Sequence, residues 1–206
     1  VAYSSINHMG YAMLGMASVI AASAMYGGNQ AAAQAGLSGA VFQMFNHGTI
    51  SAMLFILVGV VYDRAHHRDI DGFGGLAKQM PLYAGICMIA FFAGLGLPGF
   101  SGFVSEFMCF IGAFPVFKAI VIISTIGILL NAAYFLSAYK RIFFGELNEK
   151  YKDMSEINNR ELFTVVPLAA VTLLLGVYPR PFLDLISNTI DHLIYQVTQI
   201  GGFAGF

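Results

Sequence analysis

Residues 94–107 read GLGLPGFSGFVSEF, and this stretch decides how the chain folds. It lies inside a long apolar segment, residues 82–112, and combines helix-breaking residues with one ionisable side chain, Glu106. Pro98 lacks a backbone N–H group and clashes with the preceding turn, so it interrupts a helix. Within a membrane, broken backbone is stable only where it is buried in protein or lines a wet cavity. A carboxyl group at that depth is costly, and we expect Glu106 to mark a functional site.

The composition of the chain is that of a membrane protein. Of the 206 residues, 58% are hydrophobic and only 10% are charged, whereas a soluble domain has about 25% charged residues. We therefore expect an integral membrane protein surrounded by the lipid bilayer. The net charge of −1 offers no basic surface, so no nucleic-acid partner is expected.

The two cysteines, Cys87 and Cys109, lie in apolar segments and lack the spacing of metal ligands. They are predicted to be small core residues. The sequence also contains no phosphate-binding glycine loop, no haem-ligand pattern and no iron–sulfur cysteine cluster. We expect no metal site, no cofactor-binding site and no redox chemistry in this chain itself.

Apolar segments of membrane-spanning length set the fold class, since about 20 residues cross the hydrocarbon core as a helix. The candidate spans are residues 1–26, 37–62, 82–112, 117–144 and 162–177. The third is too long for one straight span, which predicts two half-helices joined by the Gly/Pro stretch. The small residues at 27–36 are predicted to form a loop. The predicted fold is all-α, a polytopic transmembrane helix bundle with about five spans, the third one broken.

The end of the chain, residues 182–206, differs from residues 1–181, which we treat as one transmembrane module. Its apolar residues recur at helical spacing, and they are Leu183, Ile186, Ile190, Leu193 and Val197. Acidic and amide side chains lie between them. This pattern predicts an amphipathic C-terminal helix that lies at the membrane interface or against a partner.

Positive charge is concentrated in two connections, residues 63–81 and 140–160, which lie on the same side of the predicted bundle. The opposite side keeps only Lys118 and Arg180. By the positive-inside rule the first side faces the cytoplasm, or the matrix if the protein is mitochondrial. The first helix then starts inside and the C-terminus lies outside.

The chain begins at Val1 and enters an apolar segment almost directly, without a start methionine or a basic n-region. Such a beginning does not match a signal peptide. We expect the chain to be the C-terminal piece of a longer protein.

Once the charged residues at helix ends are set aside, three ionisable side chains remain at depth within the predicted spans: His8, His47 and Glu106. Each histidine has a plain structural interpretation, since polar side chains also hold membrane helices together. Burial disfavours the charged form of a carboxyl group and a nearby cation favours it, so Glu106 beside broken backbone can exchange protons. Histidine changes charge near neutral pH and is the natural relay partner. The three residues together predict a chain of proton sites within the bilayer.

Several motifs resemble those of one known family. Residues 2–11, AYSSINHMGY, resemble an "AYSSISHMGF" motif, and residues 43–48, QMFNHG, are similar to a "Q-M-x-x-H-G" helix. Residues 96–99, GLPG, followed by GFVSEF at 102–107, also match, and the agreement continues to GVYP at 176–179. These motifs resemble the antiporter-like subunits of respiratory complex I, the NADH–quinone oxidoreductase.

The resemblance implies a proton-translocating subunit of the membrane arm, driven by quinone reduction elsewhere in the complex. Glu106 would be the terminal site of a hydrophilic axis, with His8 and His47 as relay positions. The implied partners are the other membrane-arm subunits of the complex and the missing N-terminal half of the same subunit. Flavin and iron–sulfur clusters are expected in partner subunits, not in this chain. The implied location is the bacterial inner (plasma) membrane, or alternatively the mitochondrial inner membrane.

Two other functions remain open at this point. A subunit of a cation/proton antiporter or of a membrane-bound hydrogenase complex would share the same module. A purely structural membrane scaffold is a different class, although a scaffold has no reason to keep a costly buried carboxyl group.

Overall fold

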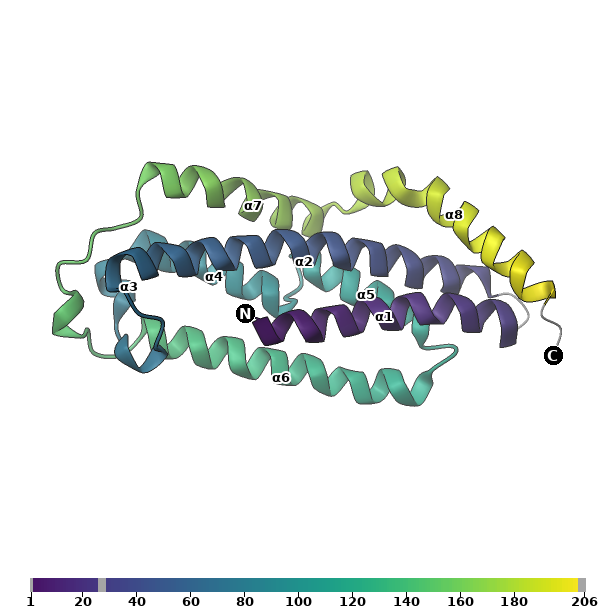
Figure 1. Ribbon diagram of the computed structural model, residues 1–206, viewed down its shortest axis with the longest axis horizontal. Coiled ribbons are helices and arrows are strands. Elements are labelled where there is room, and N and C mark those ends of the chain that lie inside the picture. Colours follow the sequence, from purple (N-terminus) through teal and green to yellow (C-terminus); the bar gives the residue numbers. More distant parts are fainter. Residues whose placement is uncertain (1, 26–28, 204–206) are drawn as a thin grey trace.

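The computed structural model describes the backbone of residues 2–25 and 29–203 and the side chains of residues 2–20 and 29–199. Within that part of the chain, every regular element is a helix, which confirms the all-α prediction. Figure 1 shows an elongated bundle in which α2 runs along the centre and the other long helices lie around it.

The long helices are α1 (Ala2–Met25), α2 (Gln30–Ala65), α4 (Pro81–Leu95), α5 (Ser101–Ala113), α6 (Lys118–Phe143), α7 (Asn159–Val177) and α8 (Arg180–Phe203). Short helices occupy two connections and are η1 (Ile70–Gly72), α3 (Leu76–Gln79) and η2 (Glu149–Tyr151). By length and composition α2, α6 and α7 are able to cross a membrane, while α4 and α5 are shorter apolar helices. The number of spans therefore stays a prediction.

The predicted break in the third apolar segment is present. α4 ends at Leu95 and α5 begins at Ser101, so the segment forms two half-helices as expected. The connection lies beside the middle of α2 (Figure 1), and α5 continues from there toward the end of the bundle at which α8 lies. The ionisable side chain that the sequence singled out is therefore carried by the second half-helix.

The predicted loop at residues 27–36 is wrong for most of its length, because α2 already begins at Gln30. Residues 27 and 28 lie outside the described part of the chain. The small side chains there serve helix packing instead: a Cβ atom on Gly36 would lie only 2.8 Å from the carbonyl oxygen of Gly15 on α1. Small residues let membrane helices approach closely, so a run of Ala and Gly forms a contact surface.

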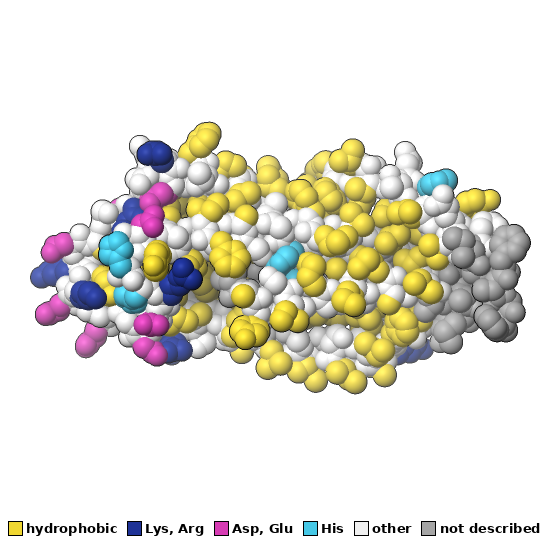
Figure 2. All heavy atoms as spheres, viewed as in Figure 1, with side chains coloured by type: hydrophobic (Ala, Val, Ile, Leu, Met, Phe, Trp, Pro, Cys, Tyr) yellow, Lys and Arg dark blue, Asp and Glu magenta, His cyan; other side chains and the backbone are white. Residues whose placement is uncertain are grey.

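Charged side chains gather at one end of the bundle, as Figure 2 shows. There Arg64 of α2 forms a bidentate ion pair with Glu161 of α7, with both N–O distances 2.9 Å. Arg64 also donates to the backbone carbonyls of Ser155 and Glu156. This clustering is what the orientation argument requires, and the orientation itself stays a prediction.

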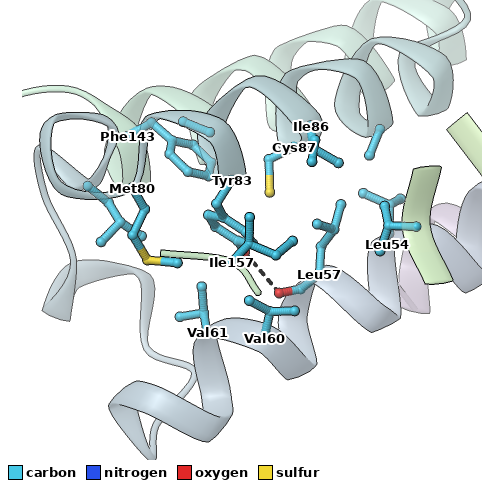
Figure 3. Packing of buried hydrophobic residues seen from close by; sticks show 14 of the residues in the cluster. Leu54, Leu57, Val60, Val61, Met80, Tyr83, Ile86, Cys87, Phe143 and Ile157 are labelled. Carbon is cyan, nitrogen blue, oxygen red and sulfur yellow. Dashed lines mark hydrogen bonds between the residues drawn. The ribbon is translucent and has the colours of Figure 1, made fainter. Parts of the chain in front are cut away.

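An apolar core lies between α2, α4, α6 and α7 near the charged end. Figure 3 shows Leu54, Leu57 and Val61 of α2 facing Tyr83 of α4 and Phe143 of α6. The Tyr83 hydroxyl donates a hydrogen bond of 2.9 Å to the carbonyl oxygen of Leu57. A buried phenol is therefore paired, and α4 is fixed against α2.

The C-terminal helix α8 packs on its own chain. Ile190 and Ile194 are buried against Val19 of α1 and Ala33 of α2. The predicted apolar stripe is displaced, because Leu193 is 41% exposed and Ile194 takes its place. The amphipathic helix thus packs one face on α1 and α2, and its place at the interface or against a partner stays a prediction; residues 204–206 lie outside the described part.

Candidate functional site

The site is built on the break between α4 and α5. α4 ends because Gly96 adopts a left-handed conformation with φ of 76°, in which its N–H group donates back to the carbonyls of Phe92 and Ala93. Residues 97–100 then form a tight turn, with Pro98 second, Gly99 third at φ of 100°, and a hydrogen bond from Phe100 N to the carbonyl of Leu97. Proline and glycine at these positions suit such a turn. The local sequence therefore fixes the break.

Glu106 lies on the second turn of α5, and its side chain turns back toward the break. The residue is 4% exposed. A Cβ atom added to Gly96 would come within 2.7 Å of the Glu106 Oε2 atom. The carboxyl group is therefore packed directly against the glycine that ends α4, and the exact path of the break decides its surroundings.

His8 of α1 brings the first relay position to the carboxyl group. Its Nδ1 atom is 3.1 Å from Oε1 of Glu106 and also 3.1 Å from Nε2 of Gln43 on α2. A ring nitrogen either accepts from the amide when it is bare or donates to the carboxylate when it is protonated. Each state of the Nδ1 atom, with or without its proton, therefore has its own partner, and the Oε1 atom of Glu106 has no hydrogen-bond partner in the arrangement observed.

His47 of α2 lies next in line. Its ring centroid is 5.6 Å from that of His8. The side chain is half-buried, and its ring nitrogens face the hydroxyl group of Ser51 at 3.2 and 3.3 Å. The structure thus brings together all three residues that the sequence singled out, in the order Glu106, His8, His47.

A polar network that the sequence reasoning missed supports these residues. The buried hydroxyl of Ser105, beside Glu106 on α5, donates to the amide oxygen of Gln43. Asn46 donates to the Ser105 hydroxyl and to the carbonyl of Ser101, both at 2.9 Å. Gln43, Asn46 and His47 share one face of α2 by their spacing, which was the available signal. Their partner Ser105 could not be identified without the fold.

A small cavity lies between α1, α2 and the break. Its lining combines polar side chains with the apolar Ile50 and Leu54, and it has room for about one water molecule. The polar lining residues are Ser4, His8, Gln43, Asn46, His47 and Ser51. Two buried oxygens, Oδ1 of Asn46 and Oγ of Ser101, have no hydrogen-bond partner within the protein. Buried polar atoms are normally satisfied by protein or water, so the site is suited to holding ordered water.

The chemistry that this arrangement supports is proton exchange. Within the described residues, His8 is the one ion-pair partner of Glu106. No three His, Cys, Asp or Glu side chains of that part gather as a metal site requires, and Cys87 and Cys109 are buried free thiols. A carboxyl group and two imidazoles, with amide and hydroxyl groups and room for water between them, are groups that can take up and release protons.

Comparison with known proteins gives a consistent result. Residues 1–131 match the family described as NADH:quinone oxidoreductase/Mrp antiporter, transmembrane. NADH-quinone oxidoreductase subunit M of Rhodobacter capsulatus is 46% identical over 94% of this chain, which covers 36% of that protein. The F(420)H(2) dehydrogenase subunit M of Methanosarcina mazei is 36% identical over 98% of this chain and 38% of its own length.

Among solved structures, the chain is similar to one in respiratory complex I from Thermus thermophilus with bound NADH. The TM-score is 0.78 at 27% sequence identity, and the match covers 94% of this chain and 38% of that one. The chain therefore spans little more than a third of the length of the relatives that it matches.

Proposed function

Because the chain belongs to the NADH:quinone oxidoreductase/Mrp antiporter transmembrane family, we propose that it forms part of a proton-translocating membrane subunit of NADH–quinone oxidoreductase, respiratory complex I. The observation that carries this proposal is the buried pair of His8 and Glu106, 3.1 Å apart, beside a broken helix. Electron transfer would occur in partner subunits that hold flavin and iron–sulfur clusters. The chain itself would move protons only.

The proposed mechanism is an exchange of one proton between neighbouring groups. When Nδ1 of His8 carries a proton, it donates to Glu106, and when Nδ1 is bare, it accepts from Gln43 instead. Quinone reduction elsewhere in the complex would change the field at this pair and shift the proton from one group to the next. His47 would exchange protons with His8 through the water that the small cavity between them is able to hold.

The proposed position of Glu106 across the membrane follows from the placement of charge. With the charged end of the bundle in the cytoplasm, α5 carries Glu106 into the outer half of the membrane. The proposed location is the bacterial inner membrane. The remaining two-thirds of the subunit and the other membrane-arm subunits would lie beside this chain and complete the proton path.

The test is Glu106→Gln in the full-length subunit within its complex, assayed as NADH-driven proton uptake into inverted membrane vesicles. Removal of a positioned proton-transfer group lowers a rate about a hundredfold or more, so pumping should be almost lost. Glu149→Gln is the matched control, because Glu149 lies on the exposed surface of η2. NADH oxidation with a soluble electron acceptor reports that the complex has assembled. Undiminished pumping in Glu106→Gln would refute the proposed role.

A cation/proton antiporter or a membrane-bound hydrogenase subunit is the second candidate, and the family description itself includes the Mrp antiporter. Isolation of the complex distinguishes them: flavin and iron–sulfur subunits indicate the dehydrogenase, whereas sodium-dependent proton transport without them indicates the antiporter. A structural scaffold is a third possibility. It requires that removal of His8, His47 and Glu106 together leaves proton transport intact.

A further inference from the structure

The end of α4 leaves backbone carbonyl groups that need partners from elsewhere. The last four carbonyls of any helix have no donor within that helix. The turn at Gly96 and Leu97 satisfies the carbonyls of Phe92 and Ala93. The next carbonyl, that of Gly94, accepts a hydrogen bond of 2.9 Å from the side-chain amide of Asn131 on α6.

Asn131 is buried and makes a second hydrogen bond that sets the orientation of its side-chain amide. The residue is 1% exposed, and its Oδ1 atom accepts a hydrogen bond from the hydroxyl of Tyr134, one turn later on α6. This second bond fixes which end of the amide faces Gly94, because the oxygen is engaged by a donor.

The packing around the break leaves little freedom. A Cβ atom on Gly94 would lie 3.0 Å from the ring of Phe135, the α6 residue next to Tyr134. Gly96 follows Gly94 by two residues and packs on the Glu106 carboxyl group. A Cβ atom added to Gly96 would lie 2.7 Å from the Oε2 atom of Glu106. A shift of the Gly94 carbonyl therefore moves the backbone against which Glu106 is held.

We propose that Asn131, oriented by Tyr134, is a positioning residue. It holds the backbone of Gly94–Gly96 in the place where Gly96 packs against the Glu106 carboxyl group. This inference rests on the proposed function of Glu106 and extends it to α6. Asn131 does not touch the proton that moves. It keeps Glu106 at the separation from His8 that proton transfer needs, because displacement of a reacting group by about 1 Å can cost up to a hundredfold in rate.

The test uses the full-length subunit in its complex and three variants on α6. Asn131→Leu has a similar shape but cannot donate to Gly94. Tyr134→Phe keeps the ring and removes the donor to Asn131. Thr125→Val is the matched control, because Thr125 is exposed and its hydroxyl donates to the carbonyl of Ile122 on its own helix.

NADH-driven proton uptake, normalised to assembled complex, is measured from acid to alkaline pH. Asn131→Leu should lower pumping about tenfold or more, and Tyr134→Phe should lower it less. In both variants the pH profile of pumping should shift, because the surroundings of Glu106 have changed. The control should match the wild type in rate and profile.

A purely structural role gives a different result, namely less assembled complex with an unchanged rate and an unchanged pH profile per complex. That result would overturn the inference for Asn131. If Asn131→Leu does not assemble, Tyr134→Phe decides alone, and a wild-type profile in that variant also overturns it. Glu106→Gln is assayed in parallel: loss of pumping there with normal Asn131→Leu refutes only the positioning role, while normal pumping in Glu106→Gln refutes the proposed function itself.

Discussion

The crossing of α2 and α5 gives the sharpest prediction about packing. Gly39 of α2 faces the backbone of α5, and a Cβ atom there would lie 2.7 Å from the amide nitrogen of Cys109 and 2.9 Å from the carbonyl carbon of Met108. Carbon atoms normally pack about 3.5–4.0 Å apart. Gly39→Ala must therefore push the two helices apart by roughly 1 Å, since rigid backbone cannot yield as a flexible side chain does.

The expected cost follows from two opposing effects. Overpacking of a well-packed site costs about 1–3 kcal/mol. The added Cβ atom would meet backbone atoms of α5, which places Gly39→Ala at the upper end of that range. Replacing glycine by alanine within a helix returns about 0.5–1 kcal/mol. The free energy of unfolding should fall by about 2 kcal/mol, which lowers the melting temperature of a chain of this size by about 4–8 °C.

The matched control is Gly59→Ala on the same helix, where nothing lies within 4 Å of the added Cβ. It should raise the melting temperature by a few degrees, since it has the helix benefit without the clash. Heating the detergent-purified chain with a thiol-reactive fluorophore measures both variants, because Cys87 and Cys109 are buried and become reactive on unfolding. Equal melting temperatures for the two variants would refute the close crossing.

Three further predictions use the same melting assay. Glu161→Gln breaks the bidentate pair with Arg64 and should cost about 1–3 kcal/mol; a smaller loss would mean that water replaces the carboxylate. Tyr83→Phe removes the hydrogen bond to the Leu57 carbonyl and should cost about 1 kcal/mol, so an unchanged melting temperature would contradict the pairing in Figure 3. Glu156 accepts from the first backbone amides of α4, and Glu156→Ala should cost about 1 kcal/mol, whereas Glu156→Gln should cost less because its amide oxygen still accepts.

Residues that dictate their own backbone were predictable. Pro98 and the glycines around it lead to a break in any context, because proline removes a donor and Gly96 and Gly99 tolerate positive φ. The long apolar segments were predictable for a similar reason, since a helix satisfies its own backbone hydrogen bonds in lipid. The grouping of His8, His47 and Glu106 was expected from their positions at membrane depth and from the resemblance, and the structure places His8 between the other two.

Features that depend on contact between helices were not predictable. The first turns of α2, which begins at Gln30, are rich in Ala and Gly, and this composition does not distinguish a loop from a packing surface. α8 buries Ile194 where the spacing favoured Leu193, because its rotation is set by α1 and α2. The choice of Ser105 as partner of Gln43 also depends on how two helices are rotated against each other.

The sequence by itself therefore determined the membrane character, the all-α class, the position of the break and the choice of Glu106, because each depends on the properties of a short stretch in lipid. The tertiary structure decided what surrounds that carboxyl group. His8 lies 98 positions before Glu106, and Asn131 lies 37 positions after the Gly94 carbonyl that it holds. Hydrogen bonds act over about 3 Å, so such partners are defined only when the helices pack.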